Sequence, residues 1–135
     1  MRRDEIKSSE DMFLYKAIID FNSGRFLLQS FNNNEVQIEP EKIYFDFQQS
    51  VEKLLKSLLT KHKIEVRKTH DIEKLITECN RNSIDLIDNV EELIDLNEYA
   101  VDGRYDIICD DLNDASIYIE LIEVFIEFTK HEIRR

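Results

Sequence analysis

The chain has 135 residues, of which 42% are apolar, and carries 29 acidic against 18 basic side chains, for a formal net charge of −11. This length and apolar content suffice for one buried core and not for two, so a single domain over residues 1–135 is predicted. Only two glycines and one proline are present. Hairpins and tight turns need several such residues, so the composition argues against a β-rich fold and favours long helices.

Other protein classes are excluded by simple patterns. No stretch approaches the roughly 18 consecutive apolar residues of a membrane span, and the first ten residues lack the apolar run of a secretory signal. We therefore expect a cytoplasmic protein. Cys79 and Cys109 lie 30 positions apart without a Cys-x-x-Cys pair. This spacing predicts neither a zinc ribbon nor a disulfide framework and favours two reduced, buried thiols.

The first two helices have clear boundaries. Apolar residues at three- and four-residue steps predict a helix from about Glu10 to Phe31, with Ser8 and Asp11 resembling a capping box. Gly24 inside this helix indicates either close approach of another helix or a local bend. After a polar break, Pro40 suits the first turn of a second helix that continues to about Leu59.

Two further helices are predicted between residues 69 and 103. The third is short and contains Ile72 to Cys79, with Thr69 or His70 as its cap. A fourth, capped by Ser83, continues through Leu86 to about Val101, and Gly103 follows as a left-handed terminator.

The last helix is predicted to begin after Asp110 or Asp111, one of which caps it, and to extend through Ala115 to about His131. Short connections favour antiparallel neighbours, so we expect an all-α, up-and-down bundle of about five helices, four long and one short. Residues 1–9 and 134–135 are expected to be frayed.

Positive charge is concentrated in one segment. Residues 53–70 contain six basic side chains and one acidic one: Lys53, Lys56, Lys61, Lys63, Arg67 and Lys68 against Glu65, with His62 and His70 nearby. A net charge of −11 argues against general binding to duplex DNA. The basic segment is interpreted in three ways: a solvated surface, a confined contact to phosphate or RNA, or an interface with the acidic last two helices of another protomer.

Tests for catalytic motifs are largely negative. None of the three histidines follows a glutamate at the three-residue spacing of di-iron bundles, and Walker, Gly-x-Gly-x-x-Gly and Gly-x-Ser-x-Gly patterns are absent. No metal or cofactor is therefore predicted. A nuclease that works without metal needs only a base, an acid and a cation, which His70 with Arg67 or Arg104 can supply. The alternative role for Arg104 is to stabilise the preceding helix end.

Polar residues also follow one side of the second helix: Gln48, Gln49, Glu52, Lys53 and Lys56. Such a row is typical of a solvated face, with Glu52 and Lys56 as an ordinary i,i+4 pair. Its functional interpretation is a polar wall for a ligand.

Three segments, taken in order, resemble one family. The run FDFQQSVEKLLKSLL (45–59) is similar to the second helix of HEPN domains, a family named for higher eukaryotes and prokaryotes and linked to nucleotide binding. THDIEKLI (69–76) resembles the family's Thr-His-Asp segment, and YAVDGRYD (99–106) its Arg-Tyr-Pro segment. Ala17, Asp20 and Ala115 also match, so the resemblance spans roughly residues 12–132.

The resemblance implies a prokaryotic helical bundle that commonly dimerises around a polar cleft. Many such proteins accompany a small nucleotidyltransferase in a toxin–antitoxin-like pair, and others are metal-independent RNases. The residues carried over as candidates for binding a ligand or partner are Gln49, Glu52, Lys53, Lys56, His70, Arg104 and Tyr105.

This sequence departs from the family pattern in informative places. The nuclease members have an arginine four to six residues before a histidine, and no such pair occurs here. Asp106 replaces the expected proline, and Ser50 and Ser57 replace alanines. We therefore expect a noncatalytic homodimer that binds a nucleotide or a nucleotidyltransferase, with an endoribonuclease using His70 and Arg104 as the alternative.

A dimer seam is predicted from surplus aromatic residues. One small core does not need all of Phe13, Phe26, Tyr44, Phe45 and Tyr118.

Overall fold

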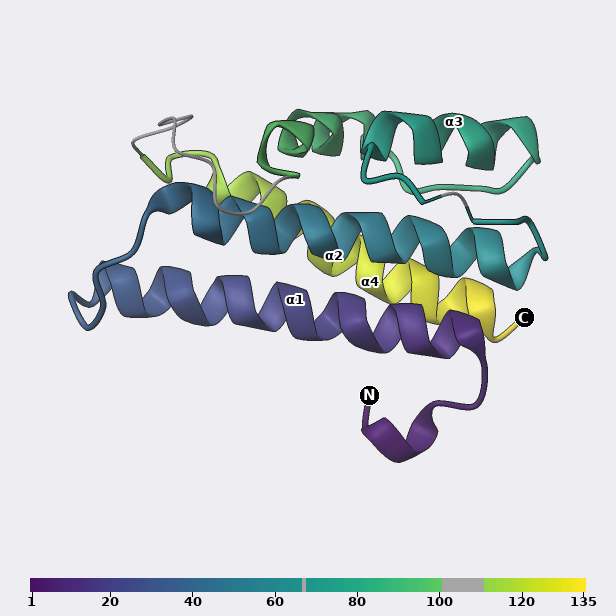
Figure 1. Cartoon of the computed structure of the whole chain (residues 1–135), viewed down its shortest axis with the longest axis horizontal. Coiled ribbons are helices and arrows are strands. Elements are labelled where there is room, and N and C mark those ends of the chain that lie inside the picture. The colour runs from purple at the N-terminus through teal and green to yellow at the C-terminus, as the bar shows by residue number, and fades with distance from the viewer. Residues whose placement is uncertain (67, 101–110) are drawn as a thin grey trace.

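A computed structural model describes residues 1–66, 68–100 and 111–135. Three long helices and two ten-residue helices form the bundle, after a one-turn 3₁₀ helix η1 (Arg3–Glu5): α1 (Ser9–Asn32), α2 (Pro40–Lys61), α3 (Ile72–Arg81), the 3₁₀ helix η2 (Val90–Tyr99) and α4 (Ala115–Ile133) (Figure 1). None of the described residues forms a strand, so the predicted all-α bundle of about five helices is confirmed.

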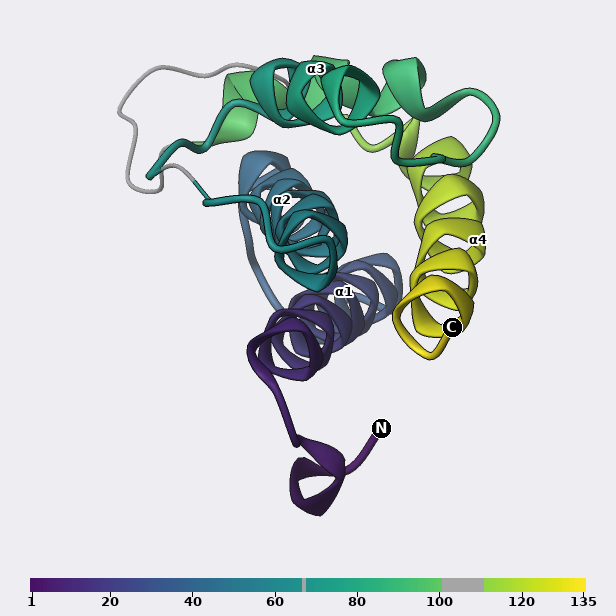
Figure 2. The same cartoon turned by 90° about the vertical axis from the view of Figure 1, so that its right-hand side faces the viewer.

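Helix α2 lies at the centre of the bundle. It contacts α1, α3, η2 and α4, and Figure 2 shows α1 on one side of it, α3 on the opposite side and α4 alongside. Because neighbours surround it, α2 buries polar positions together with its apolar stripe, including Gln48, Ser50, Glu52 and Ser57. The expectation that this row of polar residues is a solvated face is therefore wrong for Gln48 and Glu52.

Helices α1 and α2 approach closely through small residues. A Cβ atom added at Gly24 would lie 2.6 Å from Cε1 of Phe47, so of the two alternatives for Gly24 the close approach of another helix is the one observed. The Ser50 hydroxyl donates to the carbonyl of Ala17 (2.8 Å), and the Ser57 hydroxyl donates to that of Glu10 (2.9 Å). The two serines that replace family alanines thus tie α2 to the backbone of α1.

The predicted beginnings of the first two helices are confirmed, and that of the third needs correction. Ser8 Oγ accepts from the backbone N–H of Asp11, and Pro40 occupies the first turn of α2. Neither Thr69 nor His70 caps α3; the cap is Asp71, whose carboxylate accepts from the N–H groups of residues 73 and 74. Thr69 Oγ1 instead accepts from the N–H of Asp71 (3.1 Å).

The fourth predicted helix begins later and has a different geometry. Ser83 does not cap it: Ser83 and Asn89 both have positive φ (58° and 65°), and a right-handed helix cannot continue through such residues. The helix begins at Val90 and is of the 3₁₀ type, burying Val90, Leu93 and Leu96. This strict three-residue spacing suits a helix with three residues per turn.

The last helix also begins without the predicted cap. Asp114 occupies the cap position with no side-chain hydrogen bond, while Asp111 accepts from the N–H of Asn113 (3.0 Å) in the turn before it. Gly103 and Asp110, for which a terminator and a cap were predicted, lie outside the described residues.

Of the five aromatic residues from which a dimer seam is predicted, Tyr44 is buried and Phe13, Phe45 and Tyr118 are partly buried. The Tyr44 side chain is buried and its ring lies 5.0–6.5 Å from the rings of Phe47, Tyr99 and Tyr118. Phe26, by contrast, is 67% exposed. No helix in residues 1–66, 68–100 or 111–135 is long and apolar enough to cross a membrane.

Candidate functional site

A polar cluster lies where the middle of α2 meets the chain segment that precedes α3. We call it the Glu52 cluster; its members are Asp20, Gln48, Gln49, Glu52, Lys53, Lys56 and His70. Five of the seven predicted site residues therefore come together: Gln49, Glu52, Lys53, Lys56 and His70. The other two, Arg104 and Tyr105, lie outside the described residues.

The carboxylate of Glu52 is the centre of the cluster. Its Oε1 atom lies 2.8 Å from Lys56 Nζ and 2.8 Å from His70 Nδ1, and its Oε2 atom accepts from Gln49 Nε2 (3.2 Å). Glu52 is only 2% exposed. A buried charge is tolerated only when it is paired and hydrogen-bonded, so these contacts are what allow a carboxylate in the interior.

His70 is held at both its backbone and its ring. The buried amide of Gln48 donates from Nε2 to the His70 carbonyl (2.8 Å), while Glu52 engages Nδ1. The His70 side chain is nevertheless 67% exposed. Its ring is therefore fixed on the protein side through Nδ1, and Nε2 remains as the ring nitrogen that can meet a ligand.

The two lysines of the cluster already have acidic partners. Lys53 Nζ forms an ion pair with Asp20 of α1, and Lys56 pairs with Glu52. Their side chains are 23% and 13% exposed. The cluster thus balances its formal charges internally, and the lysines are not the free cationic clamp that the sequence suggested.

A shallow depression of about 300 Å³ lies next to His70 and is lined by Thr69, His70, Asp71, Asn97 and Ala100. Asp71 and Asn97, which line one side of it, join the beginning of α3 to η2 by hydrogen bonds. Asn97 accepts from the N–H of Ile72 (2.8 Å) and donates to the Asp71 carboxylate (2.9 Å). This contact fixes the beginning of α3, and with it the residue that precedes Asp71.

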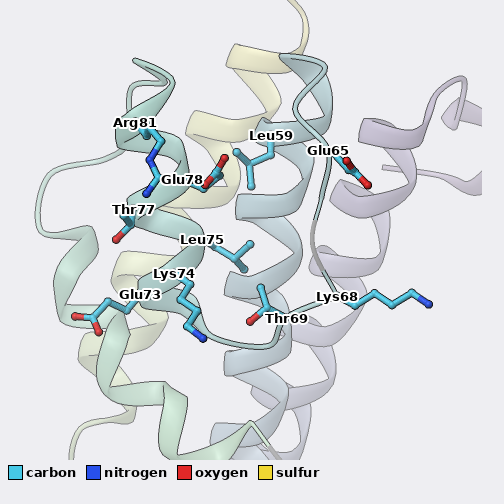
Figure 3. A pocket seen from close by; sticks show the side chains of 10 residues that line it. All are labelled: Leu59, Glu65, Lys68, Thr69, Glu73, Lys74, Leu75, Thr77, Glu78 and Arg81. Atoms are coloured by element: carbon cyan, nitrogen blue, oxygen red, sulfur yellow. Dashed lines mark hydrogen bonds and ion pairs between the residues drawn. The ribbon is translucent and has the colours of Figure 1, made fainter.

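The other described lysines and histidines of the predicted basic segment do not line this depression. His62, Lys63 and Lys68 are exposed in the connection after α2, and Arg67 is outside the described residues. A second pocket, of about 570 Å³, lies between this connection and α3, with Leu59 and Leu75 at its base (Figure 3). Three acidic and three basic side chains line it: Glu65, Glu73 and Glu78 against Lys68, Lys74 and Arg81. It therefore presents no net positive charge to an anion.

Cys79, the cysteine that the structure describes, is buried. Burial raises the pKa of its thiol to about 12, with the nearby Glu78 carboxylate acting in the same direction. Because thiolate is the nucleophilic form, Cys79 is an inert core thiol, as expected. Cys109 lies outside the described residues.

Three residues of the site were not among the predicted ones. Asp20 was noted only as a family match on the first helix, although its carboxylate neutralises Lys53. Gln48 was placed on the polar flank, whereas it supports the backbone of His70. Asn97 carried no signal in the sequence, since a polar residue in a surface helix is ordinary and its contact with Asp71 spans 26 positions.

Comparison with known proteins identifies the family of this chain. The family model of the HEPN domain matches residues 13–133, a range that includes all residues of the Glu52 cluster. Neither the curated proteins nor the solved structures with which the chain was compared include a significant match. The family match covers well over half of the chain and agrees with its helical architecture, so this chain belongs to the HEPN domain family.

Proposed function

We propose that this protein is a noncatalytic, homodimeric HEPN protein that binds the phosphate group of a nucleotide at the depression beside His70. The observation that carries the proposal is the pair of contacts at Glu52. One buried carboxylate oxygen holds both the ammonium group of Lys56 and the imidazole of His70. Burying a carboxylate for this purpose is unfavourable for stability, which supports a role in positioning the two groups.

Of the residues that line the depression, His70 offers a phosphate a donor, since its ring keeps Nε2 for a ligand. Lys56 does not line the depression, but it is bound to the same Glu52 oxygen as His70. Hydrogen bonds to the charged oxygens of a phosphate are among the stronger polar contacts in proteins. The volume of the depression, about 300 Å³, is at the lower end of the range for small-ligand sites.

Isothermal titration with adenosine and guanosine mono-, di- and triphosphates tests the proposal. We expect His70→Ala to weaken binding by about tenfold, the effect of losing one charge-assisted hydrogen bond. His131→Ala is the matched control, because His131 is an exposed histidine on α4 outside the cluster. Absence of heat with every nucleotide, or equal losses in both variants, would contradict nucleotide binding.

A nucleotidyltransferase partner is the other ligand implied by the family, in a pair of toxin–antitoxin character. The same donors would then meet a carboxylate of that protein. Co-purification of the two proteins, lost in His70→Ala and kept in His131→Ala, together with no nucleotide heat, would assign the cluster to the partner instead.

The endoribonuclease is retained as a second candidate because of one observation. A histidine whose Nδ1 lies 2.8 Å from a carboxylate is the arrangement that orients a general base. We expect cellular RNA incubated with the protein and excess chelator to remain intact, since the arginine–histidine spacing of the family's nucleases is absent. Cleavage by the wild type that disappears in His70→Ala would make the protein an enzyme.

A further inference from the structure

A groove follows the contact between α1 and α4, on the side of the bundle away from α3 (Figure 2). It consists of two hollows, of about 520 Å³ and about 260 Å³, which adjoin because Asn22 and Arg25 line both of them. We call it the α1–α4 groove. Its lining residues on α1 extend from Ile18 to Asn33, a distance of about 22 Å at the rise of an α-helix. The groove is therefore longer than a single small molecule needs.

Side-chain amides line the wider of the two hollows. Asn22, Gln29, Asn32 and Asn33 lie on one face of α1 and are exposed, and their side-chain amides make no hydrogen bond within residues 1–66, 68–100 and 111–135. Each amide offers both a donor and an acceptor, as a peptide group does. A row of such groups suits a ligand that presents N–H and C=O groups at intervals along its length.

Phe26 gives the same hollow an apolar contact. Its side chain is 67% exposed, more than that of any other large apolar residue in the described part of the chain, and Ile119 of α4 lines the hollow with it. Covering an exposed aromatic ring with an apolar group is favourable in proportion to the area removed from water. The ligand that fits this hollow therefore carries an apolar side chain as well as polar main-chain groups.

The narrower hollow is bounded by charged side chains. Arg25 lies 3.7 Å from Glu123 and Lys130 lies 3.2 Å from Glu127, and the four side chains are between 41% and 73% exposed. Ion pairs that are this exposed are weak, so a ligand cation can replace either basic partner. Glu120, also exposed, lies on α4 one turn before Glu123, in a chain whose net charge is −11. The charge at this end of the groove thus favours a basic ligand.

Length and chemistry together distinguish between the ligands that such a groove could take. A nucleic-acid strand would also use the amides and the Phe26 ring, but its phosphates would be repelled by the acidic chain. A helical peptide has its N–H and C=O groups bonded internally, so the amides of α1 would find few partners on it. An extended peptide leaves both groups free and rises about 3.3 Å per residue, so about seven residues match the groove.

We propose that the α1–α4 groove binds an extended, basic peptide segment of a partner protein. Its main chain exchanges hydrogen bonds with the side-chain amides of α1, one of its apolar side chains covers Phe26, and a lysine or arginine reaches Glu123 and Glu127. This surface is separate from the proposed nucleotide site, because no member of the Glu52 cluster lines either hollow.

An NMR titration of the ¹⁵N-labelled protein tests the proposal. The probe is a heptapeptide with blocked ends in which lysine and leucine alternate, and we expect it to shift the side-chain NH₂ signals of Asn22 and Gln29, with saturation below about 1 mM. Phe26→Ser should weaken binding at least tenfold and Gln29→Leu about threefold. Val124→Ser is the matched control, since Val124 is an exposed apolar residue of α4 outside both hollows, and its affinity should equal that of the wild type. Far-UV circular dichroism checks that each variant remains folded.

Two further peptides separate main-chain recognition from charge attraction. N-methylation of the leucine main-chain nitrogens keeps the charges and removes N–H donors, so affinity should fall by about tenfold. The counterpart with glutamate in place of lysine should not bind.

Three outcomes overturn the proposal. Equal affinity of the methylated and unmethylated peptides, or equal losses in Phe26→Ser and Val124→Ser, would show general attraction to an acidic surface. Shifts confined to residues outside the groove would place the peptide elsewhere. A ten-nucleotide oligouridylate that shifts the Asn22 and Gln29 signals, when the basic peptide does not, would make the groove a nucleic-acid site.

Discussion

At the scale of single residues, Glu52 is the most consequential side chain of the site. It is 2% exposed, and its partner Lys56 has a side chain that is 13% exposed. Removing one member of such a pair leaves the other charge buried without compensation, which is more harmful than replacing both. Stability and the proposed binding therefore depend on the same carboxylate.

Glu52→Gln is expected to lower the free energy of unfolding by about 2–4 kcal/mol, because the ammonium of Lys56 loses its counter-charge. The double variant Glu52→Gln with Lys56→Met should recover most of this loss. Urea denaturation measures both. Glu127→Gln, which removes a 73%-exposed partner of Lys130, is the control and should change stability by less than about 0.5 kcal/mol. Equal effects of Glu52→Gln and Glu127→Gln would show that the burial of Glu52 does not increase the loss of unfolding free energy when its charge is removed.

At Gly24, the addition of a single methyl group should lower the stability of the protein. An added Cβ would lie 2.6 and 2.9 Å from two ring atoms of Phe47, which is fully buried, so the ring or the helix must shift to admit it. We expect Gly24→Ala to destabilise the protein by about 1–2 kcal/mol, since overpacking exceeds the gain in helix propensity. Ser23→Ala, at the exposed neighbouring position, should be neutral or slightly stabilising in the same thermal melts. A stabilised Gly24→Ala would mean that the two helices can separate without loss.

The site residues that sequence reasoning found are those tied to a local pattern. Gln49, Glu52, Lys53 and Lys56 follow one another along α2 at helical spacing, so identifying the helix brings them together. That Lys53 has an acidic partner could not be predicted, because Asp20 lies 33 positions before it and pairs with it only after α1 and α2 pack.

At the scale of elements, the beginning of α3 depends on a contact with η2. Asp71 accepts from two N–H groups of the first turn, and Asn97 accepts from a third, that of Ile72. The first N–H groups of a helix have no partner within it, so this arrangement satisfies three of them. Because His70 precedes the cap, the same contact also determines where the imidazole lies.

Asn97→Ala is expected to destabilise the protein by about 1–2 kcal/mol and to expose the amide of Ile72, which loses its only described acceptor. Amide hydrogen exchange followed by NMR should show faster exchange at Ile72 and unchanged exchange in the middle of α2. Asn80→Ala, at an exposed position of α3, is the control. Unchanged protection of Ile72 would show that water or another group replaces the Asn97 oxygen.

The elements also show which helices sequence patterns can predict. α1 and α2 are long and strongly periodic, and their observed first residues lie within one position of the predicted ones. The prediction for the fourth helix is wrong because a three-residue spacing of apolar residues also fits part of an α-helical pattern. The positive φ values of Ser83 and Asn89, which decide where it begins, depend on the surrounding packing and leave no periodic signal.

At the scale of the whole molecule, an ion pair connects the beginning of α1 with the residue that follows α4. Arg134, just after α4, donates to Asp11 Oδ1 (2.7 Å), and the N–H of Lys7 donates to Oδ2 of the same carboxylate (2.9 Å). The Asp11 side chain is 5% exposed. The contact closes α1 against α4 at the end of the bundle remote from the α1–α2 connection (Figure 1), and so connects the first long helix with the last.

This carboxylate should make the bundle sensitive to acid. Burial opposes ionisation of Asp11, but hydrogen bonds from Arg134, the Lys7 N–H and Ser8 outweigh it, so the pKa of Asp11 lies below its ordinary value. A group with a depressed pKa in the folded state stabilises it fully above the unfolded pKa, near 4, and loses this contribution as pH falls through the folded value. Asp11→Asn should therefore lower the free energy of unfolding by about 2 kcal/mol at pH 7 and by clearly less near pH 2. Urea denaturation across this range measures the difference, with Asp88→Asn, at an exposed position, expected to show no such pH dependence. If the two variants had parallel pH profiles, the ion pair between Asp11 of α1 and Arg134 after α4 would not contribute to acid unfolding.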